Sequence, residues 1–361
     1  MVDVKKLIKE FSQADMQAYI EQYNMGDLAF GTFFPSKYTP DLTFESLQAA
    51  TGAKVAAPVV SFNSRAPRAG RPTVGKVVGD IPKIELARVK DERDINTYRQ
   101  LLGKAAASRN PAITKAIIDW IYEDTKFTLD SVNARIEWLS KQAASNGRYE
   151  LTMTNNELGV VTKVPIDFGI PTANRKNATA PWANPATAKP ITDIRAMQQA
   201  ARAKGKKVLY ATTDQETMDK MLDAVETQTF CASYAAVALD IQARPTVEAL
   251  NNALQRNNLP TFRVWDSYVN IENKKGEQVT ESGWVEGNVT FTVQSMLGDI
   301  QYTDTADGWV TIDQSVKSYS DFVLVKAYAE QDPIGMVTKG IAYATPVLAN
   351  SESTWILKTV A

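Results

Sequence analysis

The chain has 361 residues, of which 40 are basic and 41 acidic, so its formal net charge is −1. A charge this close to zero gives no general attraction to nucleic acid or to a membrane surface. Its length is enough for two or three domains, and its 44% hydrophobic and 22% charged residues are typical of a soluble globular protein. Histidine is absent, which removes the commonest general base and metal ligand, and the single cysteine excludes an internal disulfide framework.

Residues 1–53 are predicted to form an N-terminal arm. Within it, residues 1–24 carry apolar side chains at helical spacing with lysines on the other side, which indicates an amphipathic helix. Because this helix is short and of mixed charge, we expect it to pack on its own or a neighbouring subunit; a membrane-surface helix is the alternative. Residues 25–45 lack periodicity and predict an extended connector, and residues 42–50 predict a short helical turn.

A basic segment follows at residues 54–90. Strands are predicted at 54–62, 74–78 and 84–89, and the glycine and two prolines of 63–72 exclude a regular core element there. The segment has eight basic and two acidic residues, a net charge of +6. A two-stranded ribbon is only marginally stable alone in water, so we expect it to lie on an acidic surface or a sheet. A solvated loop is one alternative. A nucleic-acid-binding ribbon is another, although no aromatic side chain interleaves with the arginines at its tip.

One long helix is predicted from Pro111 to Asn146. Asn110 can cap its first turn, Pro111 suits the first helical position, and Gly147 tolerates the left-handed conformation that ends a helix. Its apolar side changes midway, so we expect its two halves to pack on different elements; two helices with a break near residues 125–128 are the alternative. A polar face is predicted to run along its whole length and to carry Asp119, Glu123, Lys126, Asp130, Glu137 and Lys141.

Further elements flank this helix. A helix is predicted at 91–107, and a β-hairpin after the long helix, with strands at 148–153 and 160–166 joined by an Asn-Asn turn. Residues 170–190 are rich in proline, alanine, asparagine and threonine, which indicates an ordered surface linker and a domain boundary.

Beyond the linker, short helices alternate with strands, which predicts a compact α/β lobe. Helices are predicted at 191–203, from a capping box at 213–216 to Val225, at 229–241 and at 245–256, and strands at 207–211, 261–271 and 288–293. Residues 339–359 return to strand character, and we expect them to pair with the 148–166 hairpin, which makes residues 190–335 an insertion.

Charge is unevenly distributed along the chain. Residues 174–207 include eight basic residues and one acidic residue, whereas residues 299–332 include seven acidic and two basic residues. Opposed surfaces on one neutral chain favour head-to-tail contact between identical copies, with random surface variation as the alternative.

The sequence contains no motif of a nucleotide-binding loop or of a nucleophile elbow. Cys231 lies in a predicted helix without any histidine to activate it, and we interpret it as a small core residue. The neighbouring carboxylates Glu123 and Asp124 are expected to be solvated or to meet a basic group. We therefore predict no catalytic residue, no metal site and no cofactor.

A series of short motifs occurs in order along nearly the whole chain: Val59–Pro67, Arg71–Val74, Gly79–Lys83, Asn146–Thr152, Val164–Gly169, Asp332–Gly340 and Ala344–Leu348. With the order of the elements, these motifs resemble the major capsid proteins of tailed bacteriophages with the Hong Kong 97-type fold. More specifically, they resemble the lambda-type major head protein (capsid protein E) family. The motifs are diffuse, so their collinear order carries more weight than any one of them.

The resemblance implies an α+β fold of the Hong Kong 97 type. Its parts would be the arm, an extended loop at 54–90, a peripheral domain at 91–189 with the helix 111–146 as its spine, an axial domain at 190–335, and return strands at 336–361. The protein would be a structural one that self-assembles as hexamers and pentamers into an icosahedral head shell around packaged double-stranded DNA. An encapsulin-like compartment shell and a histidine-free α/β enzyme are the alternatives.

The resemblance also gives the basic loop a place on a neighbouring subunit. The expected inter-subunit contacts are Arg65, Arg68, Arg71 and Lys76 from the loop, and Glu123, Asp130 and Glu137 from the polar face of the spine helix. Further expected partners are a separate scaffold protein, a portal and non-specifically contacted DNA, with a decoration protein left open and no membrane. The implied location is the virion, assembled in the host bacterial cytoplasm. The near-neutral net charge departs from what a DNA-lined shell suggests.

Overall fold

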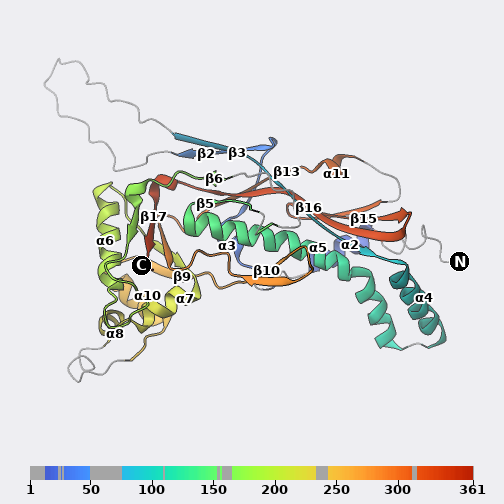
Figure 1. Cartoon of the computed structure of the whole chain (residues 1–361), viewed down its shortest axis with the longest axis horizontal. Coiled ribbons are helices and arrows are strands. Elements are labelled where there is room, and N and C mark those ends of the chain that lie inside the picture. Colours follow the sequence, from blue (N-terminus) through green and yellow to red (C-terminus); the bar gives the residue numbers. More distant parts are fainter. Residues whose placement is uncertain are drawn as a thin grey trace, which may run out of the picture.

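The computed structural model describes residues 13–22, 26, 28–48, 75–108, 110–152, 155–156, 165–232, 243–310 and 315–360. The molecule is elongated, with a long helix through its middle (Figure 1). A lobe of helices and strands lies at one end, and a two-helix corner projects at the other. Among the described residues, no helix is long and apolar enough to cross a membrane.

The long helix is α5, Pro111–Asn146, and it is continuous over 36 residues. The Asn110 side chain accepts a hydrogen bond from the Ala112 backbone N–H at 3.0 Å, and Pro111 occupies the first turn. Gly147 closes the helix with φ 67°, a left-handed conformation that glycine adopts without strain. The predicted single helix is confirmed, and the alternative of two helices with a break is wrong.

The first hydrophobic core lies between α5 and a six-stranded sheet. The strand order is β1-β13-β16-β15-β14, and β4 pairs with another part of β16. Gly340 of β16 lies against α5, because a Cβ there would stand 2.5 Å from the Thr128 carbonyl oxygen. The sheet comprises β1 (Ser36–Tyr38), β4 (Lys83–Lys90), β13 (Gly298–Thr303), β14 (Ser315–Ser320), β15 (Val323–Gln331) and β16 (Ile334–Leu348).

Four of the described helices accompany this sheet. Helix α4 (Glu92–Ala107) begins at a capping box with Asp91 and projects beside the start of α5, which confirms the helix predicted at 91–107. Helix α2 (Gln13–Gln22) covers the outer edge of β14, where Gln17 exchanges two hydrogen bonds with the Tyr319 backbone. The short α3 (Phe30–Phe33) packs on α5. Another short helix, α11 (Ala306–Trp309), lies between β13 and β14.

The second hydrophobic core belongs to the lobe, whose five-stranded sheet has the order β7-β17-β12-β8-β9. Its strands are β7 (Arg175–Asn177), β8 (Tyr210–Thr213), β9 (Thr261–Val264), β12 (Asn288–Thr292) and β17 (Thr354–Lys358). Its helices are α6 (Pro190–Ala203), α7 (Gln215–Asp223), α8 (Val225–Cys231) and α10 (Val247–Arg256).

The pairing predicted for the end of the chain is wrong. Strand β16 lies in the six-stranded sheet, whereas β17 lies between β7 and β12 in the lobe. The described residues of the predicted 148–166 hairpin form β5 (Arg148–Tyr149) and β6 (Ile166–Asp167), which pair only with each other among the described strands; residues 153–154 and 157–164 lie outside the described residues. Because β13, β14 and β15 also belong to the first sheet, the segment 190–335 contributes to both halves of the molecule.

Several local predictions also need correction. Residues 43–48 form a strand, β2 (Thr43–Gln48), and not a helical turn; β2 pairs with β3 (Gly75–Asp80). The predicted strand at 54–62 lies outside the described residues. The capping box at 213–216 does not form, because the Thr213 hydroxyl bonds to Asn288 and Asp214 instead of the helix backbone. The strand predicted at 261–271 is interrupted, and its second part, β10 (Val269–Glu272), pairs with β11 (Gln278–Glu281).

The remaining described elements are the 3-10 turns η1 (Thr172–Asn174) and η2 (Ser351–Ser353). The segment predicted to be a surface linker is more integrated than expected, because it contains β7 and the fully buried Trp182. The indole N–H of Trp182 donates to Asp193 of α6 at 3.0 Å, which fixes the linker to the lobe.

Candidate subunit interface

The stem of the basic loop is a narrow antiparallel ribbon of β2 and β3, which pair from Thr43↔Asp80 to Gln48↔Gly75. The Phe44 ring is fully buried at the base of this ribbon. It lies directly under Gly79, where a Cβ would stand 2.6 Å from the ring, and near Phe168 at a centroid distance of 6.3 Å. The stem is therefore fixed to the body at its base.

The predicted contact residues of the loop are only partly placed. Arg65, Arg68 and Arg71 lie outside the described residues. Lys76 lies in β3 with its backbone opposite Leu47, and its side chain is outside the described part. Residues 49–74, between the two stem strands, contain four basic residues and no acidic one. Strand β4 was predicted to belong to the extended loop at 54–90, but it lies in the six-stranded sheet.

The first half of the spine helix meets basic side chains of β4. The Arg88 guanidinium lies 3.9 Å from the centre of the Phe127 ring and 3.4 Å from a Glu123 oxygen. The Lys90 ammonium pairs with the buried Asp124 carboxylate at 2.5 Å. Glu123 stays 64% exposed in its side chain, so a solvent-facing carboxylate remains available there. Asp130 is half-buried on the same helix.

Glu137 is a correction, because it does not belong to an exposed polar face. Its carboxylate is fully buried and accepts hydrogen bonds from the backbone N–H groups of Ala29 and Phe30, at 3.1 and 2.7 Å. It also accepts from the Trp265 indole at 2.5 Å and from the Ser267 hydroxyl. These donors come from the start of α3 and from the link between β9 and β10. Glu137 is therefore an internal tie and is not free to pair with a neighbouring subunit.

Lys141 is likewise buried and not on a polar face. Its ammonium donates to the Ser267 carbonyl at 2.6 Å, so Glu137 and Lys141 each hold the Trp265–Ser267 segment. Burial lowers the pKa of Lys141 to about 8, against the opposing effect of Glu137 and other nearby carboxylates. The signal missed in the sequence is the run of small residues near the helix end, including Ser140, Ala143 and Ala144, which permits close packing on every side.

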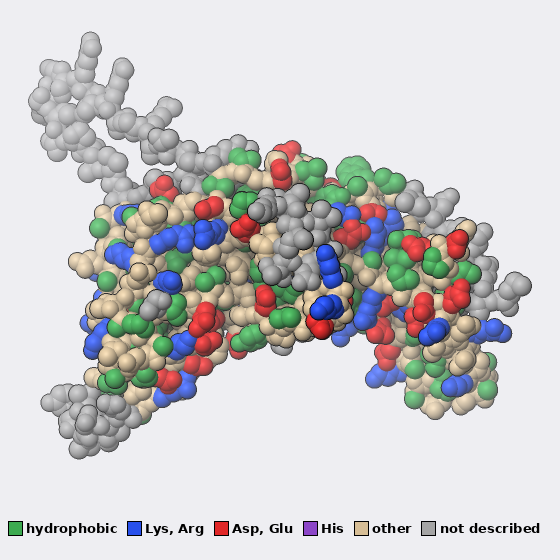
Figure 2. Space-filling view, in the orientation of Figure 1, with side chains coloured by type: hydrophobic (Ala, Val, Ile, Leu, Met, Phe, Trp, Pro, Cys, Tyr) green, Lys and Arg blue, Asp and Glu red, His purple; other side chains and the backbone are tan. Residues whose placement is uncertain are grey.

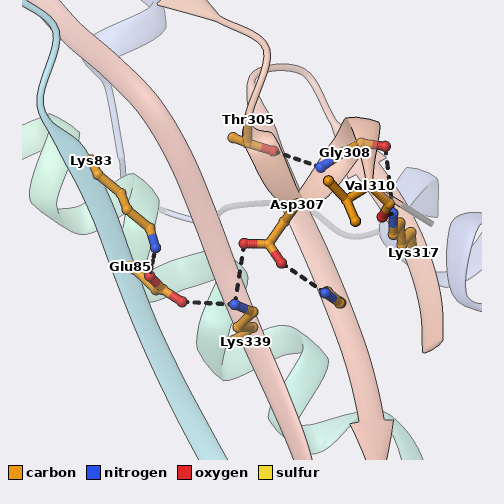
Figure 3. Close-up of polar contacts among 9 residues, drawn as sticks. Lys83, Glu85, Thr305, Asp307, Gly308, Val310, Lys317 and Lys339 are labelled. Atoms are coloured by element: carbon orange, nitrogen blue, oxygen red, sulfur yellow. Dashed lines mark hydrogen bonds and ion pairs between the residues drawn. The ribbon is translucent and has the colours of Figure 1, made fainter. Parts of the chain in front are cut away.

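A line of alternating charges crosses the six-stranded sheet near α11 (Figure 3). Lys83 pairs with Glu85 on β4, Glu85 with Lys339 on β16 at 3.0 Å, and Lys339 with Asp307 of α11 at 3.3 Å. Asp307 also pairs with Lys326 of β15 at 2.7 Å. Burial alone would raise the pKa values of Glu85 and Asp307, but their lysine partners outweigh it and lower both pKa values.

The acidic and basic segments identified in the sequence differ in how their charged side chains are placed: several acidic side chains have partners within the chain, whereas most basic side chains are exposed. In the acidic segment 299–332, Asp307 is paired as above, Asp304 accepts from the Tyr38 hydroxyl at 2.8 Å, and Asp321 accepts from Ser36 at 2.5 Å. In the basic segment 174–207, most basic side chains are exposed at the surface. The exposed members are Lys176, Lys189, Arg195, Arg202, Lys204 and Lys207.

Within the described residues, no group of three or more acidic, cysteine or histidine side chains is arranged to hold a metal ion. Cys231 is half-buried at the end of α8, and burial raises the pKa of its thiol, which keeps it protonated and poorly nucleophilic. The features that dominate the molecule are thus structural ties and charged surfaces.

Comparison with known proteins places these features in one family. The family model for phage major capsid protein E matches residues 12–359. None of the curated proteins matches the chain in a sequence comparison. A crystal structure described as the capsid protein of a prophage from E. coli CFT073 is similar over 97% of this chain and 99% of its own, with 13% identity and a TM-score of 0.56.

A phage-related protein from Bordetella bronchiseptica RB50 is similar over 96% of both chains, with 12% identity and a TM-score of 0.53. At these identities the likeness establishes a shared fold, which is the Hong Kong 97-type fold expected from the sequence. The family match over nearly the whole length agrees with that fold, and the chain belongs to the phage major capsid protein E family.

Proposed function

We propose that the chain forms the head shell of a tailed phage by assembling with copies of itself into hexamers and pentamers. The family match over residues 12–359 carries this proposal. The structure supports it, because the two-stranded stem leads into a segment, 49–74, whose four basic residues have no acidic residue among them. A segment of this kind needs an oppositely charged surface, and a neighbouring copy supplies one.

The acceptor for the basic loop is the part of the neighbour's spine helix that carries Glu123 and Asp130. Glu123 supports this assignment because its carboxylate is largely exposed and its ion pair with Arg88 is long, at 3.4 Å. Glu137 is excluded from the acceptor because all its hydrogen bonds lie within its own subunit. Each exposed pair contributes less than about 1 kcal/mol, so the contact works through several weak pairs together.

The acceptor is tested by reversing its charge. The double variant Glu123→Lys, Asp130→Lys should raise the protein concentration needed for assembly, because it places like charges opposite the loop. Glu248→Lys is a control for reversal of a single charge at an exposed site, since Glu248 is exposed on α10 of the lobe. Equal effects of the double variant and the control on assembly would contradict this acceptor.

The shell encloses packaged double-stranded DNA, which it contacts without sequence specificity. A separate scaffold protein and a portal take part in assembly in the host bacterial cytoplasm, and a decoration protein can be added to the finished head. The chain has no catalytic role in this proposal, in keeping with the absence of histidine and the protonated thiol of Cys231. The encapsulin-like shell and the α/β enzyme are not favoured, because the matching family model describes a phage major capsid protein.

Electron microscopy of the purified chain at increasing concentration tests assembly itself. Closed shells, or rings of five and six subunits, are the expected result. A protein that remains strictly monomeric in sedimentation at every concentration, even when produced together with its scaffold protein, would contradict the proposal.

A further inference from the structure

The most exposed large hydrophobic side chain among the described residues belongs to α11. Trp309 is 77% exposed and the adjacent Val310 is 55% exposed. In the space-filling view, hydrophobic side chains gather over α11 along the upper edge of the molecule (Figure 2). A large aromatic side chain in water is costly unless something covers it, so this surface needs an explanation.

Trp309 belongs to a larger aromatic surface. Tyr319 of β14 lies against the same short helix, because a Cβ on Gly308 would stand 2.7 Å from its hydroxyl oxygen. Asp304 lies near Tyr319 and accepts a hydrogen bond from Tyr38, which is 51% exposed. We call these residues the α11 surface: Tyr38, Asp304, Trp309, Val310 and Tyr319.

The α11 surface is held firmly in place. Asp307 ties the helix to Lys326 and Lys339 of the sheet below (Figure 3). The Lys317 ammonium donates to the Val310 carbonyl at 2.6 Å, which satisfies the end of the helix. These contacts fix the position of the helix that carries Trp309, which lowers the entropic cost of burying Trp309 in an interface.

The backbone edge next to this surface is already closed. Gln17 of α2 donates to the Tyr319 carbonyl at 2.9 Å and accepts from its N–H at 3.0 Å, as a neighbouring strand would. A partner therefore meets side chains here and not a free strand edge. Tryptophan and tyrosine in such positions are the residues that most often dominate the energy of protein interfaces.

We propose that the α11 surface is buried against a second copy of the chain, with Trp309 as its anchor. Asp304 disfavours an anionic occupant such as DNA or an acidic lipid surface. A second copy offers complementary charge, because residues 174–207 hold eight basic residues and one acidic residue, most of the basic ones exposed. This proposal rests on the proposed function, since it requires that copies assemble.

Fluorescence quenching by acrylamide tests the proposal directly. The difference in emission between the wild type and Trp309→Phe isolates Trp309 from the other six tryptophans, since the chain has seven. Trp309 should be quenched freely in dispersed subunits and several-fold less in assembled shells. The same difference for the fully buried Trp182 is the control, and it should be protected in both states.

Substitution gives a second measure. Trp309→Ala should raise the concentration needed for assembly about tenfold or more, as loss of an interface anchor does, with no loss of thermal stability. Tyr268→Ala, at a residue 60% exposed in the link between β9 and β10, should leave assembly unchanged.

The outcomes separate the two proposals. The inference would be overturned if Trp309 were as accessible to acrylamide in shells as in subunits. It would also be overturned if the Trp309→Ala variant assembled like the wild type. Either result would leave the proposed function standing. A wild-type chain that never assembles, even when produced together with its scaffold protein, would contradict both. Protection of Trp309 with weakened assembly of the alanine variant supports the inference.

Discussion

Both halves of α5 carry charged residues, which are exposed in the first half apart from Asp124 and are buried at Glu137 and Lys141 in the second half. The first half, up to Phe127, packs beside α4 and β4 and leaves Glu123 in water. The second half is enclosed between the six-stranded sheet and the lobe, where residues 288 and 290 of β12 donate hydrogen bonds to its last carbonyls. There, Glu137 and Lys141 become internal ties. A charge pattern along a helix therefore does not reveal which face is exposed to solvent until the elements that pack on the helix are known.

The largest expected effect is on folding stability at Glu137. Glu137→Gln should lower the free energy of unfolding by about 3 kcal/mol or more, because two backbone N–H groups and two side-chain donors lose a buried carboxylate. Chemical denaturation measures the change. Glu123→Gln in the first half is the matched control and should change stability by less than about 0.5 kcal/mol. Equal losses of stability in Glu137→Gln and Glu123→Gln would contradict the difference between the two halves of α5.

A methyl group added to β16, where the strand lies against the middle of α5, should have the next largest effect. Gly340→Ala places a Cβ 2.5 Å from the Thr128 carbonyl oxygen, so the sheet and helix must separate, at a cost of about 1–3 kcal/mol. Gly103→Ala in α4 is the contrasting variant, because nothing lies within 4 Å of the new methyl group. It should stabilise the protein by up to about 1 kcal/mol, since alanine favours a helix. A Gly340→Ala protein as stable as the wild type would contradict close packing here.

Lys141 predicts a dependence of stability on pH. Its pKa is lowered to about 8 in the folded chain, so between that pH and its unfolded pKa the unfolded chain binds the extra proton. Stability should therefore rise with pH above 8, by at most about 1.4 kcal/mol per pH unit from this group. Burial raises the pKa of Tyr149, which works against stability above about pH 10, so the useful window is pH 8 to 9.5. Lys141→Met should flatten the slope in denaturation curves; an unchanged slope would refute the assignment.

The smallest expected effect concerns the ties of α11 in acid. The pKa of Asp307 is lowered by its lysine partners, so its contribution is present above about pH 4 and is lost as pH falls through the lower folded value. The protection factor for backbone hydrogen exchange at residues 306–310, which corrects the rate for its intrinsic dependence on pH, should therefore fall below pH 4. In Asp307→Asn, this protection factor should already be low at neutral pH and should change little with acid. Identical exchange profiles in the two proteins would show that Asp307 does not hold α11.

Structural features that are set by residues adjacent in the sequence could be predicted well. Asn110, Pro111 and Gly147 set the ends of α5 through their own backbone preferences, and both ends were placed correctly. Contacts between distant segments were not accessible in the same way. The pairing of β17 with β12, and the donation of Trp265 to Glu137, each join segments far apart in the chain, and no local pattern encodes them.

The candidate interface could likewise be predicted only in part from the sequence. The basic character of the loop is a property of composition and could be recognised from the sequence. The exposure of Trp309 depends on α11 lying across the sheet through Asp307, which the sequence does not indicate. The acidic residues of the spine helix could be identified, but not which of them the lobe covers.

Assembly should depend most directly on the contact of the basic loop with the next copy. Sedimentation velocity of the triple variant Arg65→Glu, Arg68→Glu, Arg71→Glu, beside the wild type, tests this most directly. A control with the same change in net charge reverses Arg256, Lys274 and Lys275, which are exposed on the lobe and on the β10–β11 ribbon. The account predicts shells for the wild type and the control, and folded, dispersed subunits with an unchanged melting temperature for the triple variant. Shells from the triple variant at wild-type concentrations would contradict it.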